Sequence, residues 1–313
     1  MLSRTANNLF WLARYVERAE NLARIIDVAM RLSTLPSAFA GKSNEWEGAL
    51  ASAFCVDEFE KVYPEASRDH VIEFLVACDA NPNCIRACVD TARSNARSVR
   101  SALTSEMWEI INDLWLKMQK ISPEDMRGNR LVEMLSAIKQ ASLQFDGAAH
   151  RTMLRTDHYS FERLGMLIER ADNTARLLDV KYHVLLPPDE PVGGGLDYFQ
   201  WTSLLRSVSA LTSFYWIYRK NVEPWLVAEF LILRTEQPRS LISVYGSINA
   251  ELDMLAERYG RQGQSQRVAR AIIGQLQNSK IGELFQAGLH EFVEDFIAHN
   301  NNLGEALVNQ YLQ

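Results

Sequence analysis

The residues best suited to chemistry lie in two similar stretches, YVERAENLARIIDV (15–28) and LIERADNTARLLDV (167–180). Eight of the fourteen aligned positions are identical, and five of those identities are polar: Glu17/Glu169, Arg18/Arg170, Asn21/Asn173, Arg24/Arg176 and Asp27/Asp179. A hydrophobic core requires only apolar side chains of suitable size, so retained polar side chains indicate a more specific role. Carboxylates can act as acids, bases or cation ligands, and arginines can hold an anionic group.

The spacing of these residues places them on one side of a helix. At 100° per residue, Glu17, Asn21 and Arg24 share a ridge that points away from the apolar stripe of the same helix. The corresponding residues of the second stretch do the same. Glu17 and Arg24 are about 10 Å apart along the helix axis, so they can bracket a group but scarcely touch each other.

Two interpretations of this Glu/Arg ridge stay open, besides a solvated face with no role. In the first, the ridges form a structural ion-pair lattice, with Glu17 paired to Arg176 and Glu169 paired to Arg24. In the second, Glu17 and Glu169 are catalytic candidates in a shared cleft, as acid and base. The candidate binding residues are Arg18, Asn21, Arg24, Arg170, Asn173 and Arg176.

Metal and cofactor sites receive little support. A di-metal carboxylate bundle needs Glu-x-x-His, which is absent from the sequence. The carboxylates of Glu17, Glu20, Glu169 and Asp172 offer a weaker alternative, a site for a hard cation such as Mg²⁺. The four cysteines, Cys55, Cys78, Cys84 and Cys88, lack a second metal-binding pair and are expected to be buried free thiols. We find no phosphate loop or dinucleotide fingerprint and expect no cofactor.

Helices must position these residues, because apolar residues recur at helical spacing and no run shows strand alternation. The first helix is expected to be capped by Ser3 and to end before Pro36. Loops are expected at 34–44 and 187–195. The aromatic run 214–218 is expected in the core and at a bundle interface. Further helices are predicted over residues 45–62, 67–79, 84–103, 105–120, 122–150, 158–184, 197–220, 223–234, 239–259, 264–277 and 281–312.

The similarity between the two stretches extends along the chain. The segment VIEFLVACDANPNCI (71–85) resembles VAEFLILRTEQPRSL (227–241), and Trp46 matches Trp201 at nearly the same offset. These matches predict two copies of one unit, at 1–155 and 156–313. The predicted fold is all-α, with two internally duplicated antiparallel helical bundles packed with pseudo-two-fold symmetry.

Composition narrows the class of protein. The 313 residues are 47% hydrophobic and 23% charged, as in ordinary globular proteins, and the net charge is −6. An acidic chain is a poor partner for nucleic acid or an anionic membrane. No stretch resembles a membrane span or a signal peptide, so we expect a cytoplasmic protein.

Several blocks resemble one known family, the bacterial alpha-E domain. They are the opening SRTANNLFWLARYVERAENLARIIDV, the segments 81–85, 92–100 and 106–109, Leu164-Gly165 with the stretch 167–172, and Glu229-Phe230-Leu231 with Pro238-Arg239-Ser240. The family's Glu motif maps to Glu17 and Glu169. The resemblance implies a helical domain found beside, or fused to, circularly permuted ATP-grasp ligases, and beside transglutaminase-like proteins. These systems are proposed to synthesise or modify peptides.

We therefore expect a helical accessory or binding protein that acts with an ATP-grasp peptide ligase. It would bind the ligase, or a peptide, through the Glu/Arg ridge. The alternative is an enzyme in its own right, with Glu17 and Glu169 in a cleft between the halves. Burial of the Glu/Arg side chains distinguishes the two hypotheses. Enclosed, mutually paired side chains favour a structural ridge, whereas a solvent-filled cleft with raised glutamate pKa values favours catalysis. The oligomeric state stays open.

Overall fold

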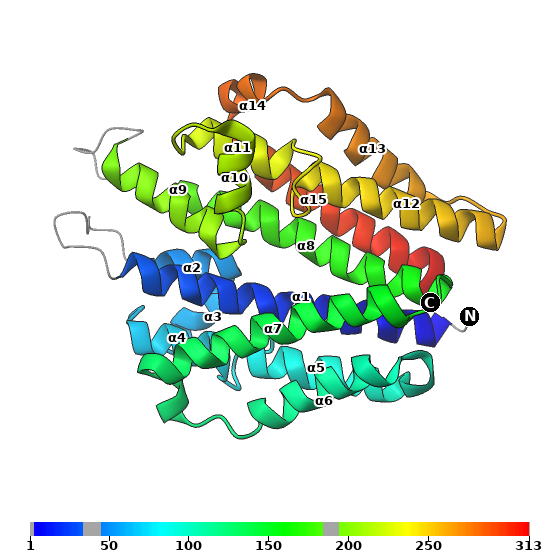
Figure 1. Ribbon diagram of the computed structural model, residues 1–313, viewed down its shortest axis with the longest axis horizontal. Helices are drawn as coiled ribbons and strands as arrows, with labels where there is room; N and C mark the ends of the chain where they lie inside the picture. The colour runs from blue at the N-terminus through cyan, green and yellow to red at the C-terminus, as the bar shows by residue number, and fades with distance from the viewer. Residues whose placement is uncertain (1–2, 34–44, 184–193, 313) are drawn as a thin grey trace.

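The described part of the chain consists mainly of helices (Figure 1). The computed structural model describes residues 3–33, 45–183 and 194–312, and within these ranges no β-strand occurs. The all-α prediction is confirmed. Most of the two predicted loops, at 34–44 and 187–195, lies outside the described residues.

The helices of the N-terminal half surround the first one. They are α1 (Ser3–Leu32), α2 (Glu45–Ala53), α3 (Val56–Glu60), α4 (Arg68–Val76), α5 (Ile85–Ser98), α6 (Ser105–Met118) and α7 (Gly128–Thr152). Short 3-10 turns, η1 (Arg100–Ala102) and η2 (Pro123–Met126), connect some of them.

The C-terminal half begins with another long helix. Its elements are α8 (Asp157–His183), α9 (Gly195–Ser207), α10 (Leu211–Tyr218), α11 (Pro224–Ile232), α12 (Leu241–Tyr259), α13 (Gln264–Asn278), α14 (Ile281–Ala287), α15 (Leu289–Leu307) and a π-helical turn (Val308–Leu312).

Helices α1 and α8 form the centre of the molecule and run side by side in the same direction (Figure 1). Helices α5 and α7 pack on α1, and α12 and α15 pack on α8. The central pair approaches closely at Gly165, where an added Cβ would lie 2.1 Å from the carbonyl oxygen of Phe10. Only glycine fits there, so this residue sets the distance between the two helices.

The hydrophobic core consists of three clusters, and α1 contributes to all of them. Phe10 packs with α8, Ile26 with α2 and α4, and Leu12 with α5 to α7. The four cysteines are free, as expected, and Cys55, Cys84 and Cys88 are buried. The prediction of burial is wrong for Cys78, which is partly exposed. None of the helices that the structure describes is long and apolar enough to cross a bilayer.

Three predicted helices are interrupted by left-handed backbone. The predicted helices 45–62 and 197–220 break at Phe54 (φ 51°) and Ser209 (φ 57°), and the predicted helix 281–312 breaks at Gly288 (φ 109°). Left-handed backbone ends a helix, and neither Phe54 nor Ser209 is a residue type that signals it. Ser122 caps the turn η2, as predicted, but α7 starts separately at Gly128.

Candidate functional site

The two glutamates of the Glu/Arg ridge lie between α1 and α8 and are enclosed. Glu17 is 1% exposed and Glu169 is 2% exposed. The parallel packing of α1 and α8 turns both ridges inward, because each ridge lies opposite the other helix. A buried carboxylate requires hydrogen-bonding or charged partners, and both residues have them.

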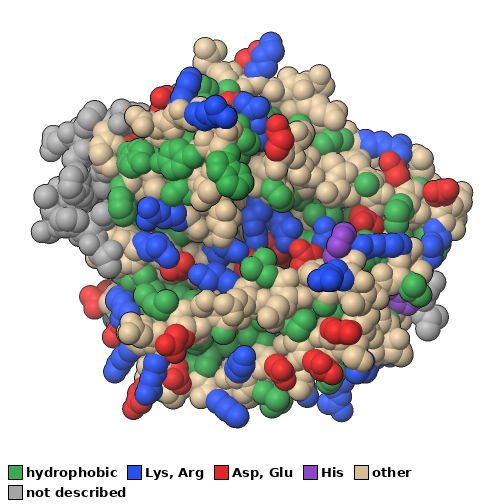
Figure 2. Space-filling view, in the orientation of Figure 1, with side chains coloured by type: hydrophobic (Ala, Val, Ile, Leu, Met, Phe, Trp, Pro, Cys, Tyr) green, Lys and Arg blue, Asp and Glu red, His purple; other side chains and the backbone are tan. Residues whose placement is uncertain are grey.

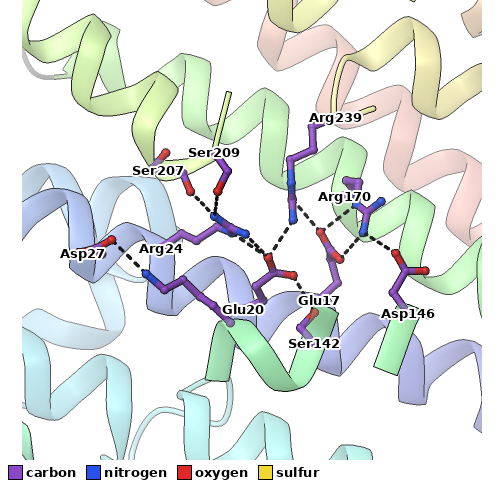
Figure 3. Close-up of polar contacts among 11 residues, drawn as sticks. Glu17, Glu20, Arg24, Asp27, Ser142, Asp146, Arg170, Ser207, Ser209 and Arg239 are labelled. Atoms are coloured by element: carbon purple, nitrogen blue, oxygen red, sulfur yellow. Dashed lines mark hydrogen bonds and ion pairs between the residues drawn. The ribbon is translucent and has the colours of Figure 1, made fainter. Parts of the chain in front are cut away.

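Glu17 is held by two arginines (Figure 3). Arg170 donates to both carboxylate oxygens of Glu17, at 3.1 and 3.0 Å, and Arg239 donates to one of them at 2.9 Å. Burial opposes ionisation of Glu17, but Arg170 and Arg239 outweigh it and lower the pKa to about 2. Glu17 is therefore a carboxylate at neutral pH.

Glu169 has a matching environment. Arg18 donates to both of its oxygens, at 2.6 and 3.2 Å, and Arg14 donates at 2.8 Å. Burial again raises the pKa of Glu169, but Arg14 and Arg18 outweigh it, so the pKa is lowered. Both glutamates are thus ionised and paired.

The predicted pairs Glu17–Arg176 and Glu169–Arg24 are wrong. The structure instead pairs each arginine with the acid one turn before it in its own helix: Arg24 with Glu20 at 2.5 Å, and Arg176 with Asp172 at 2.5 Å. The helices are in register with residue 17 opposite residue 170, so Arg24 and Arg176 lie about two turns beyond the paired glutamates.

Glu20 is fully satisfied (Figure 3). It accepts from Arg24, from Arg239 at 2.9 Å and from the Ser142 hydroxyl at 2.6 Å. Arg24 also donates to the Ser207 carbonyl at 2.5 Å. We call this group, Glu17, Glu20, Arg24, Ser142, Arg170 and Arg239, the closed network.

Asp172 occupies a different setting, beside a pocket. Its Oδ1 atom is buried and has no partner among the described residues, and the same holds for Asn173 Nδ2 and Arg176 Nη1. Burial raises the pKa of Asp172, and Arg176 offsets this only in part. The pocket has a volume of about 290 Å³ and is lined by residues of α1, α2, α3 and α8 and of the turn 81–83. We call it the Asp172 pocket.

A family model matches residues 1–312, essentially the whole chain. The chain belongs to the Alpha-E family. The family is described as a predicted alpha-helical domain with a conserved ER motif. Four Glu-Arg dipeptides occur in this chain, and two of them, Glu17-Arg18 and Glu169-Arg170, lie in the two similar stretches. In both of these the glutamate is paired across the α1–α8 contact. Searches of curated proteins and of solved structures each gave no match.

The candidate residues of this Alpha-E chain fall into two groups. Glu17, Arg24 and Arg170 belong to the closed network. The Asp172 pocket is lined by the others, Arg18, Asn21, Glu169, Asn173 and Arg176. The ridge is therefore enclosed on one side and open to a pocket on the other.

Sequence reasoning missed three residues that complete these sites: Arg14, Asn83 and Arg239. A signal for the last two was present, because Asn83 and Arg239 occupy matching positions in the similar segments 71–85 and 227–241. No metal centre accompanies them, since the described residues contain no group of three or more His, Cys, Asp or Glu placed to hold an ion.

An aromatic surface lies away from the ridge. In Figure 2, hydrophobic side chains gather on the upper left of this face, over α10 and α11. Trp216 is 74% exposed, and Tyr215 lies beside Tyr198 with 3.0 Å between their hydroxyls. The run 214–218 was predicted to lie in the core, and this is confirmed for Phe214, which is fully buried. The prediction is wrong for Trp216, because Trp216 lies on the outer face of the short helix α10.

Proposed function

We propose that this Alpha-E chain is a cytoplasmic binding protein and not an enzyme of the Glu17/Glu169 type. A general acid must hold a proton near neutral pH, and a good general base needs a pKa near the working pH. Glu17, with a pKa of about 2, and Glu169, with a lowered pKa, meet neither condition. The arginines around them act as structural partners.

We also propose that the chain is an internal duplication, with repeats at 1–155 and 156–313. Reciprocal contacts support this: Glu17 pairs with Arg170, and Glu169 pairs with Arg18. The left-handed breaks at Phe54 and Ser209 follow α2 and α9, which are the second helices of the two halves. The ion-paired α1–α8 contact is then the pseudo-two-fold interface, which fixes the register of the repeats.

The partner we propose is an ATP-grasp peptide ligase, as the resemblance to the alpha-E family implies, within a peptide synthesis or modification system that includes a transglutaminase-like protein. The observation that carries a docking role is the aromatic surface formed by Tyr198, Tyr215, Trp216 and Ile217. Exposed aromatic clusters mark interaction sites, and tryptophan and tyrosine supply much of the binding energy at protein interfaces.

The test is binding of the chain to an ATP-grasp ligase of this type, measured by calorimetry, with ligase ATP turnover as a second readout. We expect Trp216→Glu to weaken the complex by about tenfold or more, because it replaces the most exposed side chain of the surface with a charged one. The matched control is Leu154→Glu, since Leu154 is 81% exposed and lies outside the aromatic surface.

Two results would contradict the proposal. Equal binding by wild type and Trp216→Glu would remove the aromatic surface from the interface. Absence of any complex, together with turnover of a peptide substrate by the chain alone that Glu169→Gln abolishes, would restore the enzyme alternative.

A further inference from the structure

The two ends of the Glu/Arg ridge are built alike but completed differently. Each has an acid and an arginine one helical turn apart, Glu20 with Arg24 and Asp172 with Arg176. Glu20 has all its partners, whereas Asp172 has one unpartnered oxygen beside a pocket. Comparison of the partners of Glu20 with those of Asp172 therefore indicates which chemical group is missing from the pocket.

A guanidinium completes the closed network. Arg239 directly precedes Ser240, the N-cap of α12, and its side chain reaches the central pair of helices. There its two terminal nitrogens donate to Glu17 and to Glu20, each at 2.9 Å (Figure 3). One planar cation thus bridges two buried carboxylates, which suits its fork of donors.

Asn83 stands in the corresponding place at the Asp172 pocket. It directly precedes Cys84, the N-cap of α5, as Arg239 precedes the N-cap of α12. The Asn83 side chain is short and neutral, and it accepts from Arg18 at 2.7 Å. It leaves Asp172 Oδ1 unpartnered and a volume of about 290 Å³ open, near the lower limit for ligand pockets.

Three residues that line the pocket each carry one buried polar atom without a partner. The acceptor is Asp172 Oδ1, and the donors are Arg176 Nη1 and Asn173 Nδ2. Asp172 is 8% exposed and Asn173 is 6% exposed, so leaving these atoms unpaired is costly. A simple anion would face the Asp172 carboxylate, and a simple cation would leave both donors unmatched.

We propose that the Asp172 pocket binds a ligand of the arginine type, with its guanidinium on Asp172 in the position that Arg239 takes in the closed network. A carbonyl or carboxylate oxygen of the same ligand accepts from Arg176 and Asn173. The pocket walls carry three carboxylates, Glu58, Glu169 and Asp172, against two arginines, which favours a net positive ligand. This inference goes beyond the proposed function and stands on the pocket alone.

The test is calorimetric titration of the full chain with L-arginine, with the peptide Gly-Arg-Gly and with L-citrulline. Citrulline has the shape of arginine without its charge, so we expect it to bind about tenfold more weakly or not at all. Binding of free arginine alone would identify a small-molecule site, and binding of the peptide would identify an arginine side chain of a polypeptide. Binding by neither, or equal binding of citrulline, would overturn the proposal.

The decisive variant is Asn83→Arg, which supplies the missing guanidinium from the chain itself. We expect it to reduce arginine binding by about tenfold or more while the melting temperature stays level or rises. Asn301→Arg is the matched control, because Asn301 is exposed on α15 and adds the same charge outside the pocket.

Asp172→Asn provides a second variant, because it removes the negative charge and keeps the shape. It should lose arginine binding even if Asn83→Arg were misplaced. Undiminished arginine binding in both variants would exclude the Asp172 pocket as the site.

Discussion

At the scale of single residues, buried glutamates in this chain behave in opposite ways. Glu17 is ionised because Arg170 and Arg239 surround it. Glu162 is also 1% exposed, but neither of its oxygens has a partner among the described residues. Burial raises the pKa of Glu162 to about 8, and Arg163 offsets this only in part. At neutral pH, Glu162 therefore holds its proton.

The first prediction concerns Glu162→Gln. Between the ordinary pKa of 4.5 and about 8, the folded state keeps a proton that the unfolded state releases, so wild type loses stability as pH rises. The loss is up to about 1.4 kcal/mol per pH unit and stops above the folded pKa. Glutamine lacks this loss, so the stability gain of the variant over wild type should grow from pH 5 to pH 8 in urea unfolding.

The control for this prediction is Glu283→Gln, because the Glu283 side chain is 65% exposed. Its stability should follow wild type at every pH. Parallel curves for wild type and Glu162→Gln would show that Glu162 titrates normally.

At the scale of helices, two C-caps adopt left-handed backbone with different residues. Helix α12 ends at Gly260 (φ 65°), and α10 ends at Arg219 (φ 49°). Glycine adopts this conformation without strain, whereas a residue with a Cβ does not. The end of α10 is therefore strained at an exposed position.

We expect Arg219→Gly to raise the free energy of unfolding by about 1 kcal/mol and Gly260→Ala to lower it by about 1 kcal/mol. Both would be measured by urea unfolding at pH 7. The double variant should show the sum of the two effects, because the caps lie on different helices. A loss of stability in Arg219→Gly would mean that the arginine contributes more than its backbone strain costs.

Most of the helices could be predicted from sequence, because the apolar stripe of each helix repeats at 3.6 residues. The breaks at Phe54 and Ser209 could not, since these residue types do not signal left-handed backbone. The polar ridge was found from repeated side chains, but its ion pairs depend on the register between α1 and α8. Arg239 was missed because it reaches Glu17 from 222 residues away in the chain.

At the scale of the whole molecule, the contact between the halves depends on one close approach. The Cβ of an alanine at position 165 would lie 2.1 Å from the Phe10 carbonyl oxygen, and backbone atoms cannot move aside as side chains can. The two central helices would have to separate, which would also stretch the ion pairs of Glu17 and Glu169.

We therefore expect Gly165→Ala to lower the free energy of unfolding by about 3 kcal/mol, at the upper end for overpacked cores. Gly246→Ala is the matched control, because Gly246 lies within α12 with nothing within 4 Å of an added Cβ. That change should be neutral or stabilise by up to about 1 kcal/mol. Equal effects of the two substitutions in thermal unfolding would disprove the close approach.

The position of α1 at the centre has a consequence for how the chain reaches this structure. Helix α1 packs with all three core clusters, yet the partners of Glu17 lie 153 and 222 residues later in the chain. Contacts between such distant segments slow folding, because long loops must close before the contacts form. During synthesis, the Glu17 carboxylate and the apolar face of α1 therefore stay without their partners until most of the chain has been made. In this period the exposed face of α1 is available to chaperones and prone to misfolding.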